Sequence, residues 1–195
     1  EYMLSHEFFV NHPDEFMNYC RENLMIEGIK PNACHYALTK LEKMGKLKGI
    51  ITQNIDGLHQ DAGSKNVIEL HGNLVDFYCT KCGKNFDLSY TKKFDGLVKC
   101  DACGGIVRPD IVLYGEGLDQ NNISYAINLI SNADVLIIGG TSLAVYPAAG
   151  LIDFYRGNKL VLINMDPTGR DSRADYLIQG DISKILEELV EGIDE

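Results

Sequence analysis

Four of the six cysteines form two Cys-x-x-Cys pairs. Cys79 pairs with Cys82 and Cys100 pairs with Cys103, with seventeen residues between the two pairs. Each pair forms a turn that directs both sulfurs to one place, so that four thiolates can surround a tetrahedral zinc ion. Because four protein ligands leave no open position for water or substrate, the spacing predicts a structural zinc site rather than a catalytic one.

The glycines next to these pairs support the zinc interpretation. Gly83 follows the first pair, and Gly104 and Gly105 follow the second, which gives the turns the permissive backbone they need. The alternative is a set of unliganded or disulfide-bonded cysteines. Because Cys20 and Cys34 stand alone, the cysteine distribution favours a metal over disulfides, and therefore a reducing compartment such as the cytoplasm.

The stretch from Thr52 to His59 concentrates amide and carboxylate side chains directly after a short apolar segment. Gln53, Asn54 and Asp56 would each need hydrogen-bond partners if they were buried in a core, which favours a ligand site. Ordinary loop capping is the alternative, because Asn and Asp satisfy turns well.

Two further segments carry groups that suit proton transfer and phosphate binding. His71 follows a second apolar segment, and an imidazole titrates near neutral pH, although a single His beside Gly can also be structural. The sequence Gly139-Gly140-Thr141-Ser142 offers small residues and hydroxyls that allow close approach of a phosphate or ribose. A simple turn with a helix N-cap is the alternative for this segment.

These residues follow apolar segments that alternate with helical patterns, which predicts an α/β fold with a doubly wound parallel sheet. The expected strands cover residues 47–52, 66–70, 134–139, 159–164 and 175–179. The expected helices cover residues 4–24, 32–44, 122–131, 147–155 and 182–190. In such sheets ligands bind beyond the carboxyl ends of the strands, where the polar segments lie. Residues 78–107 form an inserted module too small to have a core of its own.

The segments TQNIDGLHQ, ELHG, the two Cys-x-x-Cys pairs, RPDIVLYGE and GGTSLAVYPAAG, in this order, closely resemble the sirtuin family. The resemblance runs from about Glu1 to near the C-terminus. It implies a Rossmann-like NAD-binding domain over residues 1–77 and 108–195 and a zinc-binding module over residues 78–107. It also implies NAD-dependent removal of acyl groups from protein lysine side chains, with the acyl-lysine peptide lying between the two domains.

The resemblance also implies residue roles. His71 resembles the general base of the family, and Asn54 and Asp56 resemble the residues that orient the departing nicotinamide and its water. The implied NAD contacts are Gln53, Asn54, Ile55, Asp56, Gly140, Thr141, Ser142 and Asn164. The implied peptide contacts are Val112, Tyr114, Gly115 and Glu116, with Val145 and Tyr146 on the opposite side.

The chain also departs from the family pattern. Sirtuins begin with a strand, a Gly-Ala-Gly-x-Ser loop and a Pro-Asp-Phe-Arg segment, which are not in this sequence, and we expect them to exist in the protein outside this chain. A non-catalytic module that binds NAD or acyl-peptides is therefore one alternative function, and protein ADP-ribosyltransferase is another. Sirtuins that prefer acidic acyl groups carry a Tyr-x-x-Arg pair, and an ungapped alignment places Cys20 and Asn23 there. Neutral acyl groups are therefore expected.

The composition is that of an ordinary globular protein, with 45% hydrophobic and 24% charged residues. The longest apolar stretches are too short to cross a bilayer, so no membrane partner is expected. A net charge of −10 argues against non-specific nucleic-acid binding and is compatible with Lys-rich peptides. The sequence leaves the oligomeric state open, with a monomer as the expectation.

Overall fold

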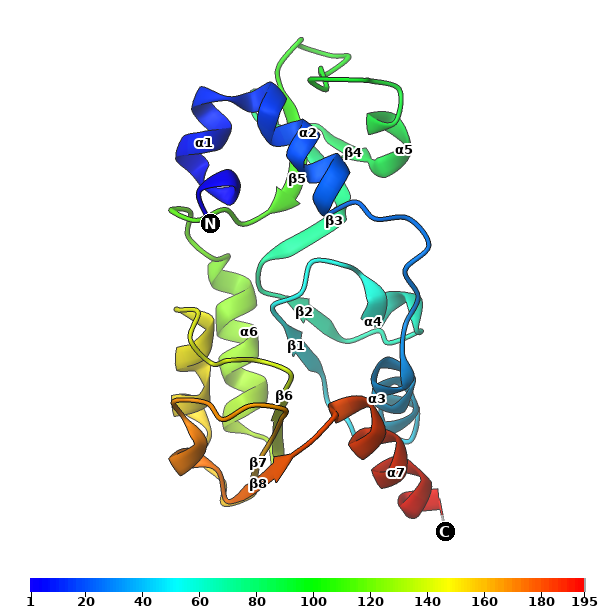
Figure 1. Cartoon of the computed structure of the whole chain (residues 1–195), viewed down its shortest axis with the longest axis vertical. Coiled ribbons are helices and arrows are strands. Elements are labelled where there is room, and N and C mark those ends of the chain that lie inside the picture. Colours follow the sequence, from blue (N-terminus) through cyan, green and yellow to red (C-terminus); the bar gives the residue numbers. More distant parts are fainter. Residues whose placement is uncertain (195) are drawn as a thin grey trace. The chain divides into compact units, whose positions relative to one another are not determined.

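The computed structural model describes residues 1–194, which form two compact units (Figure 1). Unit 1 contains Glu1–Ile29, Asn54–Gly57 and His71–Leu118. Unit 2 contains Lys30–Gln53, Leu58–Leu70 and the chain from Asp119 onward. The predicted module at residues 78–107 lies wholly inside unit 1, which also contains the N-terminal helices, and the proposed domain boundaries stay a prediction.

Unit 1 combines short helices with an antiparallel sheet. The sheet has the order β4 (Asn85–Asp87), β3 (Gly72–Cys79) and β5 (Val107–Ile111), and the helices are η1 (Tyr2–Leu4), α1 (His6–Asn11), α2 (Pro13–Asn23) and α5 (Leu88–Thr91). The expected helical stretch 4–24 is interrupted twice. Ser5 caps α1 by accepting a hydrogen bond from the Phe8 amide, and Pro13 begins α2, where its missing N–H costs nothing.

The core of unit 1 packs apolar side chains of α1 and α2 together with those of β3 and β5. Phe9 and Phe16 meet edge to face at 5.1 Å in this core. The buried cysteines Cys79 and Cys100 belong to the same cluster. The zinc-module cysteines therefore share their core with the N-terminal helices, as a module without its own core requires.

Unit 2 is built on parallel strands. β1 (Ile50–Thr52) pairs with β2 (Val67–Glu69), and β6 (Leu136–Gly139), β7 (Leu160–Asn164) and β8 (Tyr176–Gln179) form a second parallel sheet. The helices are α3 (Ala33–Lys43), α4 (Leu58–Asp61), α6 (Gln120–Ser131), η2 (Ala148–Phe154), η3 (Asp171–Arg173) and α7 (Ile182–Asp194). Strands and helices alternate, which confirms the predicted α/β Rossmann-like fold. The expected helix at 147–155 is a 3₁₀ helix, η2.

Helix α3 anchors two parts of unit 2. It packs against α7 through a core that includes Ala37, Leu41 and Leu186, and Figure 1 shows the two helices side by side. At its C-terminal end the Glu42 carboxylate accepts hydrogen bonds from the backbone amides that precede β2, at 2.9 and 2.7 Å. This helix therefore fixes the start of β2, and with it the strand pair whose ends carry the predicted site residues.

None of the helices in residues 1–194 has the length and apolar character needed to cross a membrane.

Candidate functional site

The loops after β1 and β6 meet in unit 2. Gln53 directly follows β1 and is half-buried, and its side-chain amide donates a hydrogen bond to the Thr141 hydroxyl at 3.4 Å. Thr141 lies just after β6, at the carboxyl end of its strand. The structure thus brings together two residues that were predicted to contact one nucleotide, at the edge where parallel sheets bind ligands.

The loop after β6 has a tight and unusual backbone. Gly140 has φ of +64°, and Leu143 has φ of +53°, a conformation that side-chain-bearing residues rarely adopt. The Leu143 amide donates to the Thr141 hydroxyl at 3.2 Å, while Ser142 is exposed. Backbone of this kind often lies at ligand sites, so Leu143 is a candidate that the sequence analysis missed. The sequence does not predict the positive φ of this residue, because Leu rarely adopts that conformation.

The predicted peptide contacts of unit 2 lie on the same loop. Val145 and Tyr146 are both exposed. The Arg170 guanidinium donates a hydrogen bond to the Tyr146 hydroxyl and lies 5.9 Å from its ring centroid. Asp153 in turn pairs with Arg173 at 2.6 Å and with Arg170 at 3.4 Å. These charged residues were not predicted, because no local sequence pattern connects them with Tyr146.

Asn164, the last residue of β7, is half-buried, and its side-chain amide donates to the Asp166 carbonyl at 2.9 Å. The neighbouring strand β8 ends in register at Gln179. The residue therefore lies at a strand end, where the predicted nucleotide contact requires it.

In unit 1, His71 immediately precedes β3 and is half-buried. Its carbonyl accepts a hydrogen bond from the Val112 amide at 2.9 Å, which ties it to the predicted peptide edge. Gly72 follows with φ of +72°, and a Cβ there would lie 1.8 Å from the Asp110 carbonyl oxygen. Only glycine allows β3 to approach β5 this closely. The glycine of the ELHG segment therefore fixes the backbone that carries His71.

The predicted nicotinamide loop is connected to the same strand. The Ile55 carbonyl accepts a hydrogen bond from the Leu74 amide at 3.1 Å, three residues after His71. Ile55 packs against the core of unit 1, whereas Asn54 and Asp56 on either side of it are exposed. This alternation presents the two polar side chains to solvent while the apolar one anchors the loop.

The four cysteine sulfurs of the predicted zinc site lie within 4.8 Å of one another. The Sγ atoms of Cys79 and Cys103 are 3.5 Å apart, and those of Cys82 and Cys100 are 3.7 Å apart. Zinc–sulfur bonds of about 2.3 Å in tetrahedral geometry place sulfurs about 3.8 Å apart, so the cluster fits a zinc ion. All four are free thiols rather than disulfides.

The two cysteine turns share one backbone geometry. In each, the glycine after the second cysteine donates its amide to the carbonyl of the first cysteine at 2.9 Å. These glycines, Gly83 and Gly104, have φ of +71° and +68°. A Cβ on Gly105 would lie 2.8 Å from the Cys79 sulfur, so this position must be glycine to leave room for the cluster. The backbone of the two turns therefore sets the positions of the four cysteine side chains.

The remaining predicted peptide edge follows β5. Val112 and Glu116 are half-buried, and Tyr114 and Gly115 are exposed. The Tyr114 backbone pairs with the N-terminal segment: its amide donates to the Leu4 carbonyl, and its carbonyl accepts from the His6 amide, both at 2.9 Å.

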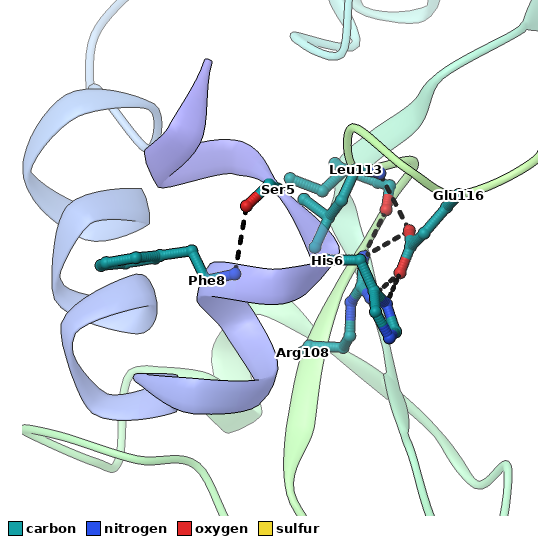
Figure 2. A network of polar contacts seen from close by, with 7 residues as sticks. Ser5, His6, Phe8, Arg108, Leu113 and Glu116 are labelled. Carbon is teal, nitrogen blue, oxygen red and sulfur yellow. Dashed lines mark hydrogen bonds and ion pairs between the residues drawn. The ribbon is translucent and has the colours of Figure 1, made fainter.

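The Glu116 carboxylate receives hydrogen bonds from Arg108, His6 and the Leu113 amide (Figure 2). Burial on its own would raise the pKa of the Glu116 carboxyl, but these bonds outweigh it and lower the pKa to about 2. Arg108 and His6 were not predicted as site residues. The opposite charges of Arg108 and Glu116, at the two ends of the segment RPDIVLYGE, could have predicted this ion pair.

Each unit therefore holds part of the predicted site. Unit 1 holds the four cysteines and Asn54, Ile55, Asp56, His71, Val112, Tyr114, Gly115 and Glu116. Unit 2 holds Gln53, Gly140, Thr141, Ser142, Val145, Tyr146 and Asn164. The roles assigned to these residues stay predictions.

A protein-family model described as the Sir2 family matches residues 1–147. A Clostridium acetobutylicum protein named NAD-dependent protein deacetylase is 56% identical over 191 residues, which cover 97% of this chain and 78% of that protein. A Sir2 structure with a p53 peptide and NAD⁺ has a TM-score of 0.90 and 39% identity, covering 98% of this chain and 82% of the other. A Sir2 structure with the inhibitor EX-527, 2′-O-acetyl-ADP-ribose and deacetylated p53 peptide has a TM-score of 0.90 and 40% identity, covering 98% and 85%.

Proposed function

Because this chain belongs to the Sir2 family, we infer that it acts as an NAD-dependent protein-lysine deacylase. The reaction removes acetyl or other neutral acyl groups from lysine side chains and releases nicotinamide and O-acyl-ADP-ribose. The observation that carries this inference is the 56% identity to an NAD-dependent protein deacetylase across 97% of the chain. The solved relative with acetyl-ADP-ribose and deacetylated peptide supports the same reaction products.

The residues of unit 2 suit the nucleotide. Gln53 and Thr141, joined by their hydrogen bond, would hold the ribose and phosphate region together with Gly140, Ser142 and Asn164. NAD supplies a ribose carbon whose bond to nicotinamide can be displaced. A neutral amide oxygen is a weak nucleophile, so the site must hold the two reacting groups in close and oriented contact. Hydrogen-bonded loops at strand ends provide such rigidity.

The residues of unit 1 suit the chemical step. Asn54 and Asp56 would orient the carboxamide of the departing nicotinamide, and Ile55 would line its pocket. After the acyl-lysine oxygen has attacked the ribose carbon, His71 would accept the proton of a ribose hydroxyl, so that this oxygen can attack the acyl carbon. General-base catalysis of this kind is typically worth about a hundred- to ten-thousandfold in rate.

The four cysteines would hold zinc as a structural ion, because they fill a tetrahedral coordination shell. The zinc would stabilise unit 1, which carries His71 and the predicted peptide edge. The remaining predictions are a monomeric state, a cytoplasmic location and no nucleic-acid partner. The net charge of −10 supports the last of these, and the spacing of the cysteines as metal ligands supports a reducing compartment.

The decisive experiment measures nicotinamide release with NAD and an acetyl-lysine peptide, and with each omitted in turn. Release that requires both supports deacylation. Peptide and NAD binding without release would instead identify a non-catalytic binding module. Transfer of radiolabelled ADP-ribose to protein without peptide deacetylation would identify an ADP-ribosyltransferase.

A further inference from the structure

We propose that Arg108 and Glu116 are positioning residues that hold segment 111–116 in the shape that receives the acyl-lysine peptide. The proposal rests on the deacylase function inferred above and on the peptide edge predicted within this segment. Neither side chain is proposed to take part in the chemical step. Figure 2 shows their contacts with each other and those of Glu116 with His6 and Leu113, all of which lie within unit 1.

Arg108 forms hydrogen bonds with both ends of the segment. Its Nη1 donates to Glu116 Oε1 at 2.6 Å and its Nη2 donates to Oε2 at 3.1 Å, a bidentate pairing. The same Nη2 donates to the Ile111 carbonyl at 2.6 Å. Because Ile111 begins the segment and Glu116 ends it, one guanidinium fixes the distance between the two.

The guanidinium is itself firmly held. Arg108 is only 2% exposed, and its guanidinium carbon lies 4.9 Å from the Phe9 ring centroid and 5.8 Å from that of Tyr78. Its Nε is buried and has no hydrogen-bond acceptor among residues 1–194. A charge removed from water in this way depends strongly on its remaining partners. The pairing with Glu116 is therefore unlike an exposed surface ion pair, which contributes little.

Glu116 closes the turn between the two ends. Its carboxylate accepts the Leu113 amide at 2.9 Å, and its own amide donates to the Leu113 carbonyl at 2.9 Å. His6 contacts the carboxylate from the N-terminal segment, with 2.8 Å between Nδ1 and Oε1. Gly115, inside the turn, has φ of +92°. The network thus shapes the backbone on which Tyr114 and Gly115 are presented to solvent.

The segment is also tied to the predicted general base, because the Val112 amide donates to the His71 carbonyl. Loosening the turn is expected to affect peptide binding first, since the network lies within the peptide edge itself. We therefore expect Glu116→Gln to raise the KM for acetyl-lysine peptide by about ten- to a hundredfold, the range typical of a charged hydrogen bond. The KM for NAD is expected to stay within about twofold.

The matched control is Glu27→Gln, which removes an ion pair of unit 1 between two exposed side chains, Glu27 and Lys92 at 2.7 Å. It is expected to leave both KM values unchanged. A folded, zinc-containing Glu116→Gln variant with an unchanged peptide KM would overturn the proposal.

A double variant separates positioning from stability. Arg108→Met with Glu116→Gln leaves no buried charge unpaired, so its melting temperature is expected to recover relative to Glu116→Gln. Its affinity for peptide is expected to stay low, because the hydrogen bonds that hold segment 111–116 in shape are still missing. Recovery of peptide affinity together with stability would show a merely structural role and overturn the proposal. If Glu116→Gln does not fold, the double variant carries the test.

Direct binding distinguishes this proposal from the proposed function. Fluorescence anisotropy of a labelled acetyl-lysine peptide reports the dissociation constant without turnover. If the unchanged chain binds peptide without releasing nicotinamide, and Glu116→Gln weakens this binding, the deacylase inference fails while the positioning role stands. If the folded chain binds no peptide, both fail.

Discussion

The side-chain amide of Gln53 lies 3.4 Å from the hydroxyl of Thr141, although 88 residues separate them in sequence. The contact joins the loop after β1 to the loop after β6. The Thr141 hydroxyl also accepts a hydrogen bond from the Leu143 amide. One hydroxyl therefore holds the loop after β6 in shape and joins it to the loop after β1. This hydroxyl is therefore a direct point at which to test the nucleotide site.

Replacing Thr141 by Val removes this hydroxyl at nearly constant volume. We expect the KM for NAD to rise about two- to tenfold, the range typical of a lost neutral hydrogen bond, and the peptide KM to stay constant. Initial rates at varied NAD and peptide would measure both. Ser124→Ala, which removes an exposed hydroxyl on α6, is the control. A rise in the peptide KM alone would place Thr141 outside the nucleotide site.

Replacing His71 by Ala should lower the deacylation rate by about a hundred- to ten-thousandfold, because a general base is lost. The fold should survive, since the hydrogen bond between His71 and the peptide edge is made by its backbone carbonyl and does not depend on the imidazole. Circular dichroism and zinc content would check this, with His12→Ala as the control for an exposed imidazole of unit 1. Deacylation within tenfold of the unchanged protein would remove His71 from this role.

One zinc ion is expected per chain, and Cys100→Ser should abolish its binding. Because Cys100 is part of the core of unit 1, loss of the metal should expose that core and lower the melting temperature. Metal analysis and thermal unfolding would measure the two effects. Cys34→Ala, in the core of unit 2, should retain zinc. Full stability of the zinc-free protein would contradict a structural ion.

The contribution of Glu116 to stability should depend on pH. Its pKa is lowered from 4.5 to about 2 in the folded protein, so the unfolded chain takes up the proton first. The stabilisation is therefore complete above about pH 5 and is lost as the pH falls from about 4.5 towards 2. The difference in unfolding free energy between the unchanged protein and Glu116→Gln, from urea titrations, should shrink over this range. A difference that grows on acidification would contradict the assigned contacts.

Acetyl- and propionyl-lysine peptides should react faster than succinyl-lysine peptides. The two positions aligned with the Tyr-x-x-Arg pair offer no cation to an acidic acyl group. Asn23 is uncharged, and burial raises the pKa of the Cys20 thiol to about 12. Side-by-side rates on one peptide sequence would test this, and faster desuccinylation would overturn it.

The sequence by itself determined the local features. Cys-x-x-Cys followed by glycine specifies a turn whose geometry depends on neighbouring residues only, and the two turns agree. The strands were also predicted, because runs such as Leu160–Asn164 are apolar and β-branched enough to mark a buried parallel strand. The predicted strand ends also gave the positions of the polar loops, because the chain leaves the sheet where each strand ends.

Only the tertiary structure decided which distant residues meet. His6 and Glu116 are 110 residues apart, and their contact depends on the N-terminal segment pairing with Tyr114. Arg170 reaches Tyr146 only because the loops after β6 and β7 end at the same sheet edge. Such contacts arise from the packing of whole elements, which no spacing within a short motif encodes.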